Sequence, residues 1–332
     1  MKAVITGCAG FIGSHVTDLF LARGWEVLGI DDLSTGRESN MPCGHERFKF
    51  KLWDLSDARE ILLVIPEEFK GAPIIHIAGL ADLVPAIENP VVYYRANVLS
   101  SVHMAELARI YRAPILYAGS SSIYGDGPQN PVSINAPGKP RHPYALSKWH
   151  GDRAIWHWHE VYGTPTIILR MFNVYGRRAR TSGRYGAMMG TFLGQKLHGL
   201  PLTIVGDGEQ SRDFIHVRDV AGLFFRAISR ARDGQSGVYN VGSGHPVRVN
   251  AVADCIDPAG KRACLPERKG EPRSIWANVE ETRRTFRWAP GIGIQEGILG
   301  LLEHIEEFRD APAWTAEMIE EETAAWHQTV GR

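Results

Sequence analysis

Short apolar runs alternate with longer amphipathic segments along the first half of the chain. Runs of strand length occupy residues 2–6, 26–30, 47–52, 74–78 and 115–118. The intervening segments, such as residues 14–23 and 94–112, place apolar side chains at helical spacing. Strands that alternate with helices are typical of a parallel sheet with helices on its faces. The pattern therefore predicts an α/β fold built on a doubly wound parallel sheet.

The regular alternation stops after Gly176. A basic, glycine-containing loop follows at residues 177–186, and an amphipathic helix is predicted at residues 217–230. A strand is predicted at residues 237–241 and a helix at residues 296–309. The pattern assigns no role to the acidic, tryptophan-containing tail that begins at Pro312.

A glycine-rich turn joins the first predicted strand to its helix. Gly7, Gly10 and Gly13 let backbone N–H groups approach a pyrophosphate at the positive end of that helix. The next predicted strand ends in Asp31 and Asp32, at the distance along the chain where an acid meets a ribose diol. Because a carboxylate there repels a 2′-phosphate, the pattern favours NAD over NADP. The alternative is an ordinary βαβ unit with acids in a surface turn.

Tyr144 and Lys148 lie four residues apart after Pro143, a residue that favours a helix start. Residues at this spacing share one face of a helix, so a phenol and an ammonium would be neighbours. The positive charge would favour the phenolate and let Tyr144 act as a base below the usual pKa of about 10. The serines at residues 120–122 follow a predicted strand, at the carboxyl end of the sheet where ligands bind.

Charge and hydropathy narrow the classes of partner. Lysine plus arginine and aspartate plus glutamate both total 37, so the chain carries no formal net charge. We therefore expect no attraction to nucleic acid or to a membrane surface, and phosphate binding must come from local sites. Met1 leads directly into the first apolar run, and no stretch of 18 apolar residues occurs. These features predict a soluble protein without a signal peptide.

The cysteines and histidines do not indicate a metal site. His157 and His159 are two residues apart on the helix predicted after Pro143, so they point to different faces. No C-x-x-C pair and no neighbouring histidine at ligand spacing accompanies Cys8, Cys43, Cys255 or Cys264. We expect no metal and a reducing, cytoplasmic compartment.

Taken together, these motifs resemble those of the extended short-chain dehydrogenase/reductases that modify nucleotide sugars. The matching residues are Gly7, Gly10 and Gly13 of the family's G-x-x-G-x-x-G, its ribose acid Asp31, and Tyr144 and Lys148 of its Y-x-x-x-K. Counting back from the family's Tyr-Gly pair, here Tyr124 and Gly125, puts the catalytic serine or threonine at Ser120. Later segments at residues 169–176, 206–216 and 239–244 also agree with the family.

The resemblance implies a set of binding residues for each ligand. The implied NAD contacts are Gly7, Gly10, Phe11, Ile12, Gly13, Asp31, Asp32, Asp54, Leu55, Ala78, Asn97, Tyr144 and Lys148. The implied nucleotide-sugar contacts are Ser120, Ser121, Ser122, Tyr144, Asn173, Arg212, Arg268 and Ile275. Among these, Asn173 and Arg212 would contact the diphosphate, with Arg268 beside them. A bidentate guanidinium suits a pyrophosphate.

The resemblance also implies a reaction, the inversion of C4 in a nucleotide-diphosphate sugar, with a UDP-sugar favoured. Tyr144 would remove the proton from the sugar O4, Ser120 would hydrogen-bond that oxygen, and Lys148 would hold the nicotinamide ribose. The resulting 4-keto sugar would turn over and be reduced on its opposite face. Alternatives are a 4,6-dehydratase, although the Asp-Glu pair of such enzymes is replaced here by Ser121 and Ser122, a uronic acid decarboxylase, and a non-catalytic Rossmann protein that binds NAD or a nucleotide sugar.

The family's organisation predicts two interleaved domains and a homodimer. Residues 1–175 and 214–243 would form the NAD-binding Rossmann domain, and residues 176–213 and 244–332 a smaller α/β domain for the nucleotide sugar. The helices that carry Asn97 and Tyr144 would form a four-helix bundle with a second copy and bury a face rich in tryptophan, including Trp149, Trp156 and Trp158. The loop at residues 126–143 is either a lid or a linker.

One residue bears on the size of the sugar. Residues 268–277 align with an Arg-x-Gly-Asp segment of the family's epimerases, which puts Ile275 at the gate of the sugar pocket. Bacterial epimerases restricted to unmodified hexoses carry a bulky tyrosine there. The smaller Ile275 therefore predicts a sugar larger than plain glucose, such as an N-acetylated hexose.

Overall fold

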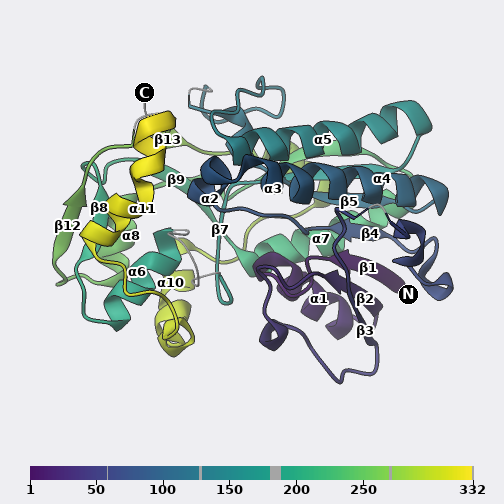
Figure 1. The fold of residues 1–332 in the computed structure, drawn as a ribbon, viewed down its shortest axis with the longest axis horizontal. Coiled ribbons are helices and arrows are strands. Elements are labelled where there is room, and N and C mark those ends of the chain that lie inside the picture. Colours follow the sequence, from purple (N-terminus) through teal and green to yellow (C-terminus); the bar gives the residue numbers. More distant parts are fainter. Residues whose placement is uncertain (58, 127–128, 180–187, 269–270, 331–332) are drawn as a thin grey trace.

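A seven-stranded parallel sheet forms the centre of the molecule. The computed structural model describes residues 1–57, 59–126, 129–179, 188–268 and 271–330. The strand order is β10-β6-β5-β4-β1-β2-β3, and every neighbouring pair is parallel (Figure 1). The strands are β1 (Lys2–Thr6), β2 (Glu26–Asp31), β3 (Phe48–Leu52), β4 (Ile74–His76), β5 (Ile115–Ser120), β6 (Thr166–Met171) and β10 (Gly237–Val241). The predicted doubly wound sheet is confirmed.

The strands are recognisable in the sequence because both faces of the sheet are covered. Strand β6, with the sequence TIILRM, is buried along its whole length, and β4 is buried at all three positions. Parallel strands covered on both sides favour continuous apolar, β-branched runs rather than alternation. The predicted strands consequently lie within two residues of the observed ones.

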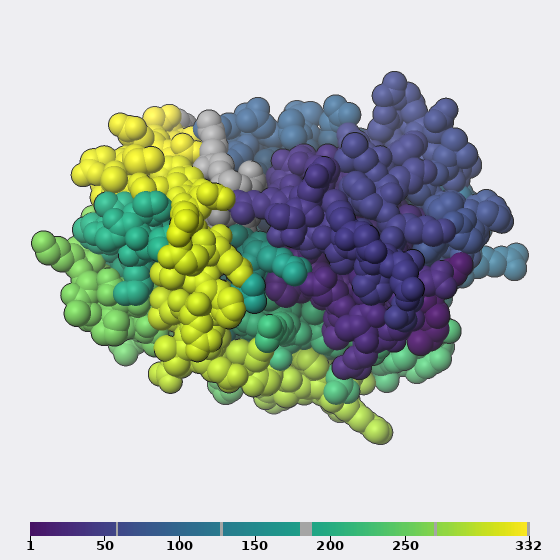
Figure 2. Space-filling view, turned by 90° about the horizontal axis from the view of Figure 1, so that it is seen from below, coloured from purple at the N-terminus to yellow at the C-terminus, as the bar shows by residue number. Residues whose placement is uncertain are grey.

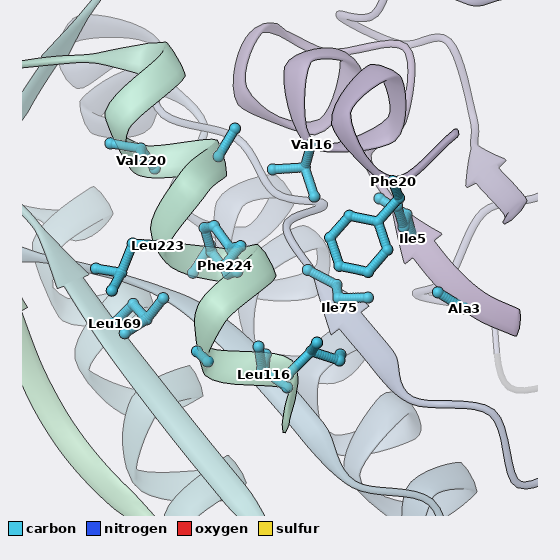
Figure 3. Close-up of a cluster of buried hydrophobic side chains, with 14 of the residues drawn as sticks. Ala3, Ile5, Val16, Phe20, Ile75, Leu116, Leu169, Val220, Leu223 and Phe224 are labelled. Carbon is cyan, nitrogen blue, oxygen red and sulfur yellow. The ribbon is translucent and has the colours of Figure 1, made fainter. Parts of the chain in front are cut away.

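Helices cover the two faces of this sheet. Helices α1 (Phe11–Ala22) and α7 (Val217–Arg232) pack against each other and against one face. Figure 3 shows Phe20 of α1 and Phe224 of α7 pointing towards Ile75 and Leu169 of the sheet. Helices α4 (Ser100–Ile110) and α5 (Pro143–Tyr162) pack together on the other face, where Met104 and Ile155 join the second buried cluster.

The second half of the chain adds a smaller α/β part with its own core. Strand β9 (Ser211–His216) pairs with β7 (Asn173–Tyr175), β11 (Pro246–Arg248) and β13 (Ser274–Ile275), and β8 (Leu202–Val205) pairs with β12 (Arg262–Leu265). Helices α6 (Met188–Leu197), α8 (Val249–Ile256) and α10 (Ile294–Leu302) enclose the cluster around Phe192 and Val252. In Figure 2 the yellow C-terminal residues gather on the side away from most of the purple N-terminal ones.

Two segments differ from the sequence-based expectation. The helix predicted at residues 296–309 ends at Leu302, because His304 has a backbone φ of −117°, outside the helical range, and only a 3-10 turn (Ile305–Phe308) follows. The tail without a predicted role forms α11 (Ala316–Thr329), which packs against α2 (Leu83–Glu88) and β12 (Figure 1).

The remaining elements are short. They are α3 (Pro90–Tyr94), the π-helical turn η4 (Arg95–Leu99), α9 (Glu280–Phe286), and the 3-10 turns η1 (Glu38–Asn40), η2 (Ile61–Leu63), η3 (Glu67–Phe69) and η5 (Ser121–Tyr124). Within the described ranges, every helix is too short or too polar to traverse a lipid bilayer.

The tryptophans of α5 do not form the exposed face that the sequence predicted. Trp156 and Trp158 are partly buried against the core beneath α5, and Trp149 packs against a separate small cluster. The indole Nε1 of Trp158 also donates a hydrogen bond to Glu106 at 2.9 Å. A large ring whose N–H finds a partner inside the subunit is better buried there than left for an interface. The prediction of a tryptophan-rich exposed face is therefore wrong.

Candidate active site

A cavity of about 680 Å³ runs along the carboxyl edge of the central sheet and into the smaller α/β part. Its lining includes residues that follow or end four neighbouring strands: Gly7 after β1, Asp31 of β2, Ala78 after β4 and Ser120 of β5. Arg212 of β9 and Ile275 of β13 line it from the smaller part. Ligands of doubly wound sheets bind at this edge, where the direction of strand addition reverses.

The turn between β1 and α1 is closed so tightly that glycine is required. Gly7 has a φ of +71°, and a Cβ on it would lie 2.8 Å from the backbone nitrogen of Ala78. A Cβ on Gly13 would lie 1.9 Å from the carbonyl oxygen of Gly7. The turn therefore leaves the first amides of α1 accessible at the cavity, where the helix dipole favours an anion such as a pyrophosphate.

The two predicted ribose acids end strand β2 beside this turn. The Asp31 carboxylate accepts hydrogen bonds from the backbone N–H groups of Ala9 and Leu33, both at 2.9 Å. Burial raises the pKa of Asp31, although these two N–H groups oppose the rise. Asp32 is exposed at the cavity and accepts from Ser34. Carboxylates at this position suit a ribose diol and oppose a 2′-phosphate.

The other implied cofactor residues differ in their access to the cavity. Phe11, Ile12, Asp54, Leu55 and Ala78 line it. Asn97 does not belong to the lining. Its amide exchanges two hydrogen bonds with the backbone of Leu80, at 2.8 and 3.0 Å, and donates to Ser147 Oγ at 2.9 Å. With a relative exposure of 1%, Asn97 orders the chain after β4 rather than facing a ligand.

Ser120 and Tyr144 meet at the centre of the cavity. Ser120 ends β5 and Tyr144 lies in the first turn of α5, which begins at Pro143 as predicted. The phenol Oη of Tyr144 donates to Ser120 Oγ at 3.3 Å, and Ser120 Oγ lies 2.8 Å from Ser122 Oγ. The two serines and the tyrosine thus form a connected row of hydroxyl groups. General acid-base chemistry on a bound hydroxyl requires a hydrogen-bonding group and a proton acceptor side by side.

Lys148 lies one turn further along α5 and has a relative exposure of only 6%. Its Nζ is 4.4 Å from the ring centroid of Tyr117, and burial lowers its pKa to about 8, a change opposed by the Asp152 carboxylate. Asp152 itself is bound by Arg170 at 2.9 and 3.0 Å.

The expected lowering of the Tyr144 pKa by Lys148 is not found. Burial raises the pKa of Tyr144, the hydrogen bond from its hydroxyl to Ser120 opposes that rise, and the nearby Asp82 carboxylate adds to it. Burial disfavours the charged phenolate, and the Lys148 ammonium lies over the ring of Tyr117. The prediction that Lys148 lowers the pKa of Tyr144 below its usual value is therefore wrong.

Two arginines form a cationic end of the cavity. Arg212 and Arg268 both line it and both contact the Glu271 carboxylate, with N–O distances of 3.1 and 3.6 Å. Burial lowers the pKa of Arg212, and Glu271 opposes that change. A pair of largely buried guanidinium groups suits a diphosphate. Asn173 is exposed at the start of β7 and lines the cavity, and Ile275 lines it with 6% exposure.

The basic loop at residues 177–186 falls largely outside the described residues. Of its described arginines, Arg177 pairs with Glu307, and Arg178 pairs with Asp18 of α1 at 2.7 Å. Among the residues that the structure describes, no group of three or more histidine, cysteine or acidic side chains could hold a metal ion.

Some parts of the lining were not predicted from the sequence. Asp82, at the start of α2, lines the cavity, and so do Thr323 and Trp326 of α11. The available signal for α11 was the spacing of Ile319, Thr323 and Trp326, which lie on one face of a helix and are all buried. That spacing predicts a packed helix but does not identify the surface it packs against.

Known proteins are similar to this chain over most of its length. A family model described as "NAD dependent epimerase/dehydratase family" matches residues 3–242. The UDP-glucose 4-epimerase of Mycolicibacterium smegmatis is 32% identical over 311 residues, which cover 91% of this chain and 98% of that protein. UDP-glucuronic acid decarboxylase 1 of Arabidopsis thaliana is 29% identical, over 90% of this chain and 68% of that protein.

A solved structure gives the same result for the fold. The UDP-glucose 4-epimerase of Thermus thermophilus, in complex with NAD, superimposes with a TM-score of 0.81 at 30% identity, over 94% of this chain and 100% of that chain.

Proposed function

Because the chain belongs to the NAD-dependent epimerase/dehydratase family, we propose that it inverts C4 of a nucleoside diphosphate sugar, with a UDP-sugar favoured. The contact between Tyr144 Oη and Ser120 Oγ, at 3.3 Å, supports this proposal most directly. A proton acceptor and a hydrogen-bond donor for one sugar hydroxyl would then share a cavity with the acids at the end of β2 and the arginines of the smaller part. The M. smegmatis relative, named UDP-glucose 4-epimerase, motivates the choice of nucleotide.

In the proposed reaction, Tyr144 removes the proton from O4 of the sugar while Ser120 holds that oxygen. Bound NAD supplies a reversible hydride acceptor and a positive charge beside the phenol. The glycine turn and Asp31 would hold its pyrophosphate and ribose, and Lys148 its nicotinamide ribose. After the 4-keto sugar has turned over, Tyr144 returns the proton to O4 on the inverted centre. Arg212 and Arg268 hold the diphosphate throughout, so the sugar turns while its anchor stays fixed.

Competing reactions of the same family require acid-base groups next to Ser120. Elimination of water needs a proton donor and a base near C5 and C6, whereas the next two residues are Ser121 and Ser122. The Ser122 hydroxyl contacts Ser120 and is a weak acid. We therefore prefer inversion at C4 to 4,6-dehydration and to decarboxylation of a uronic acid.

One experiment separates these outcomes. Purified protein is incubated with UDP-, GDP-, dTDP- and CDP-sugars, and the products are identified by NMR. We expect C4 epimers of a UDP-sugar with no change in mass. A stable 4-keto-6-deoxy product would establish a dehydratase, a pentose product would establish a decarboxylase, and binding without turnover would establish a non-catalytic binding protein.

We further propose that residues 1–175 and 214–243 bind NAD, and that residues 176–213 and 244–332 bind the nucleotide sugar. The pairing of β10 with β6 supports the return of the chain to the first domain.

We also propose homodimerisation through α3, η4 and α5. The contacts would be made by other residues than the predicted tryptophans. These elements pack side by side and expose apolar side chains at Val91, Val92, Tyr94, Leu99, Leu146, Val161 and Tyr162. Exposed apolar side chains gathered on neighbouring helices favour a protein partner.

A further inference from the structure

The C-terminal helix α11 forms part of the wall of the active-site cavity. Ile319, Thr323 and Trp326 make a buried stripe on one face of α11, with exposures of 0%, 3% and 2%. Ile319 packs against Leu265 and Trp314 and thereby anchors the helix to the smaller part. The next two residues of the stripe line the cavity. The helix lies beyond residue 242, where the family model ends.

Trp326 is close to the reacting tyrosine. Its ring centroid is 5.6 Å from that of His142, and the His142 ring in turn stacks on Tyr144 at 5.9 Å with an interplanar angle of 11°. The three aromatic rings form a continuous row from α11 to the first turn of α5. Trp326 is therefore separated from the catalytic phenol by one side chain.

His142 also identifies the end of the cavity to which Trp326 belongs. Its Nδ1 accepts the backbone N–H of Ala145 at 3.2 Å, so in the neutral ring the proton is on Nε2. Burial lowers the pKa of His142 to about 4, and the Glu271 carboxylate opposes that change. Glu271 is the residue that holds Arg212 and Arg268. His142, with Trp326 against it, is thus close to the reacting tyrosine and within electrostatic reach of the carboxylate at the cationic end.

The group that occupies this position in a bound nucleoside diphosphate sugar is the hexose. It must span from Tyr144, where C4 reacts, to the arginines, where the diphosphate binds. An indole gives such a ring a large, rigid apolar face for its C–H groups.

We propose that Trp326 is a specificity-determining residue of the sugar subsite, where its indole packs against the hexose of the nucleoside diphosphate sugar. The inference rests on the proposed function, since it assumes that a nucleotide sugar occupies the cavity. It assigns part of the sugar wall to α11.

The test compares binding of UDP with binding of UDP-glucose by calorimetry. In Trp326→Leu, we expect the affinity for UDP-glucose to fall about tenfold, while the affinity for UDP stays within about twofold because the arginines are untouched. Trp326→Phe keeps an aromatic wall, so its affinity for UDP-glucose should lie between those of the wild type and of Trp326→Leu. The matched control is Trp288→Leu, which removes another buried indole, 7% exposed, from the core against the central sheet.

An unchanged ratio of the two affinities in Trp326→Leu would overturn the inference, and so would equal losses for UDP and UDP-glucose in both Trp326 variants. Wild-type protein that binds UDP but gains nothing from the glucose would also overturn it. Failure of the wild type to bind any UDP compound would instead refute the proposed function, and the inference with it.

Discussion

At the scale of single residues, the chemistry of the site depends on how burial changes each ionisable group. The neutral forms of Tyr144 and Lys148 are both favoured: the pKa of the phenol is raised, and that of the ammonium is lowered to about 8. Burial is the largest cause of both changes. A phenol that is hard to ionise in the protein alone needs a further positive charge nearby to act as a base, and under the proposed function bound NAD would supply that charge.

Removing the Tyr144 hydroxyl should stop the reaction without disturbing the fold. In Tyr144→Phe, we expect kcat to fall by about 10²- to 10⁴-fold, the range for loss of a general base. The ring that stacks on His142 is retained. Rates of C4 inversion are measured by NMR, with Tyr162→Phe, an exposed phenol on the same helix, as the control. Undiminished turnover in Tyr144→Phe would contradict the mechanism.

Ile275 should influence which sugars fit. It is buried in the cavity wall beside Ile123 and Phe172. Tyrosine at this position would take up space needed by an N-acetyl group as the keto sugar turns. We expect Ile275→Tyr to lower kcat/KM for UDP-N-acetylhexosamines about tenfold more than for UDP-hexoses. Steady-state kinetics on both substrate classes provide the measurement, and equal losses would show that Ile275 only packs the wall.

At the scale of elements, helix α5 carries both Tyr144 and Lys148, so its first turn must be well fixed. Pro143 occupies the first turn, His142 caps it, and Gly163 ends the helix with a φ of 70°. Histidine is an unusual cap compared with serine, threonine, aspartate or asparagine. Its ring serves both the helix end and the aromatic row that reaches Trp326.

The cap also makes part of the stability depend on pH. The folded pKa of His142 is about 4, below its ordinary value of 6.5, so below pH 6.5 the unfolded chain binds more protons than the folded one. The free energy of unfolding should therefore fall as the pH drops from 6.5 to 4, by about 3 kcal/mol at most from this residue.

Chemical denaturation of the wild type and of His142→Asn at several pH values isolates this effect. Asparagine preserves the cap but does not titrate. The wild type should therefore lose more stability than the variant over that pH interval. Other buried histidines, such as His76, titrate in both proteins and cancel in the difference. Parallel pH profiles for the two proteins would show that His142 does not titrate in this way.

At the scale of the whole molecule, the cavity is built by segments that are distant in the sequence. The central sheet supplies the glycine turn and the hydroxyl row, the smaller part supplies the arginines, and α11 supplies a further wall. None of the exposed apolar residues of α3 and α5 named above lines the cavity, although α5 also carries Tyr144. Assembly of two chains there would therefore stabilise α5 without blocking the cavity.

The dimer proposal has a direct test in sedimentation. We expect the wild type to sediment at twice the mass of one chain at micromolar concentration, and Val91→Glu/Leu146→Glu to sediment as a monomer, because burying two carboxylates in an apolar interface is unfavourable. Leu299→Glu, which adds a charge at an equally exposed position on α10, is the control. A wild type that sediments as a single chain would exclude the proposal.

Much of the site is local in origin and could be read from the sequence. The strand, glycine turn and helix around Gly7, the acids that end β2, and the spacing of Tyr144 and Lys148 all depend on neighbours within one element. Parallel strands covered on both faces leave continuous apolar runs, so most strands of the central sheet could be located in the sequence as well. The matching family motifs then allowed Ser120 to be assigned to the same site as Tyr144.

Only the tertiary structure decided which surfaces those elements meet. The spacing of Tyr144 and Lys148 suggested a lowered phenol pKa, but burial and, to a smaller extent, Asp82 raise it, and both effects depend on parts of the chain outside helix α5. Asn97 was expected at the cofactor and instead binds Leu80 and Ser147. The stripe of Ile319, Thr323 and Trp326 indicated a buried helix face, but long-range packing, which no local pattern encodes, put that face in the active-site wall.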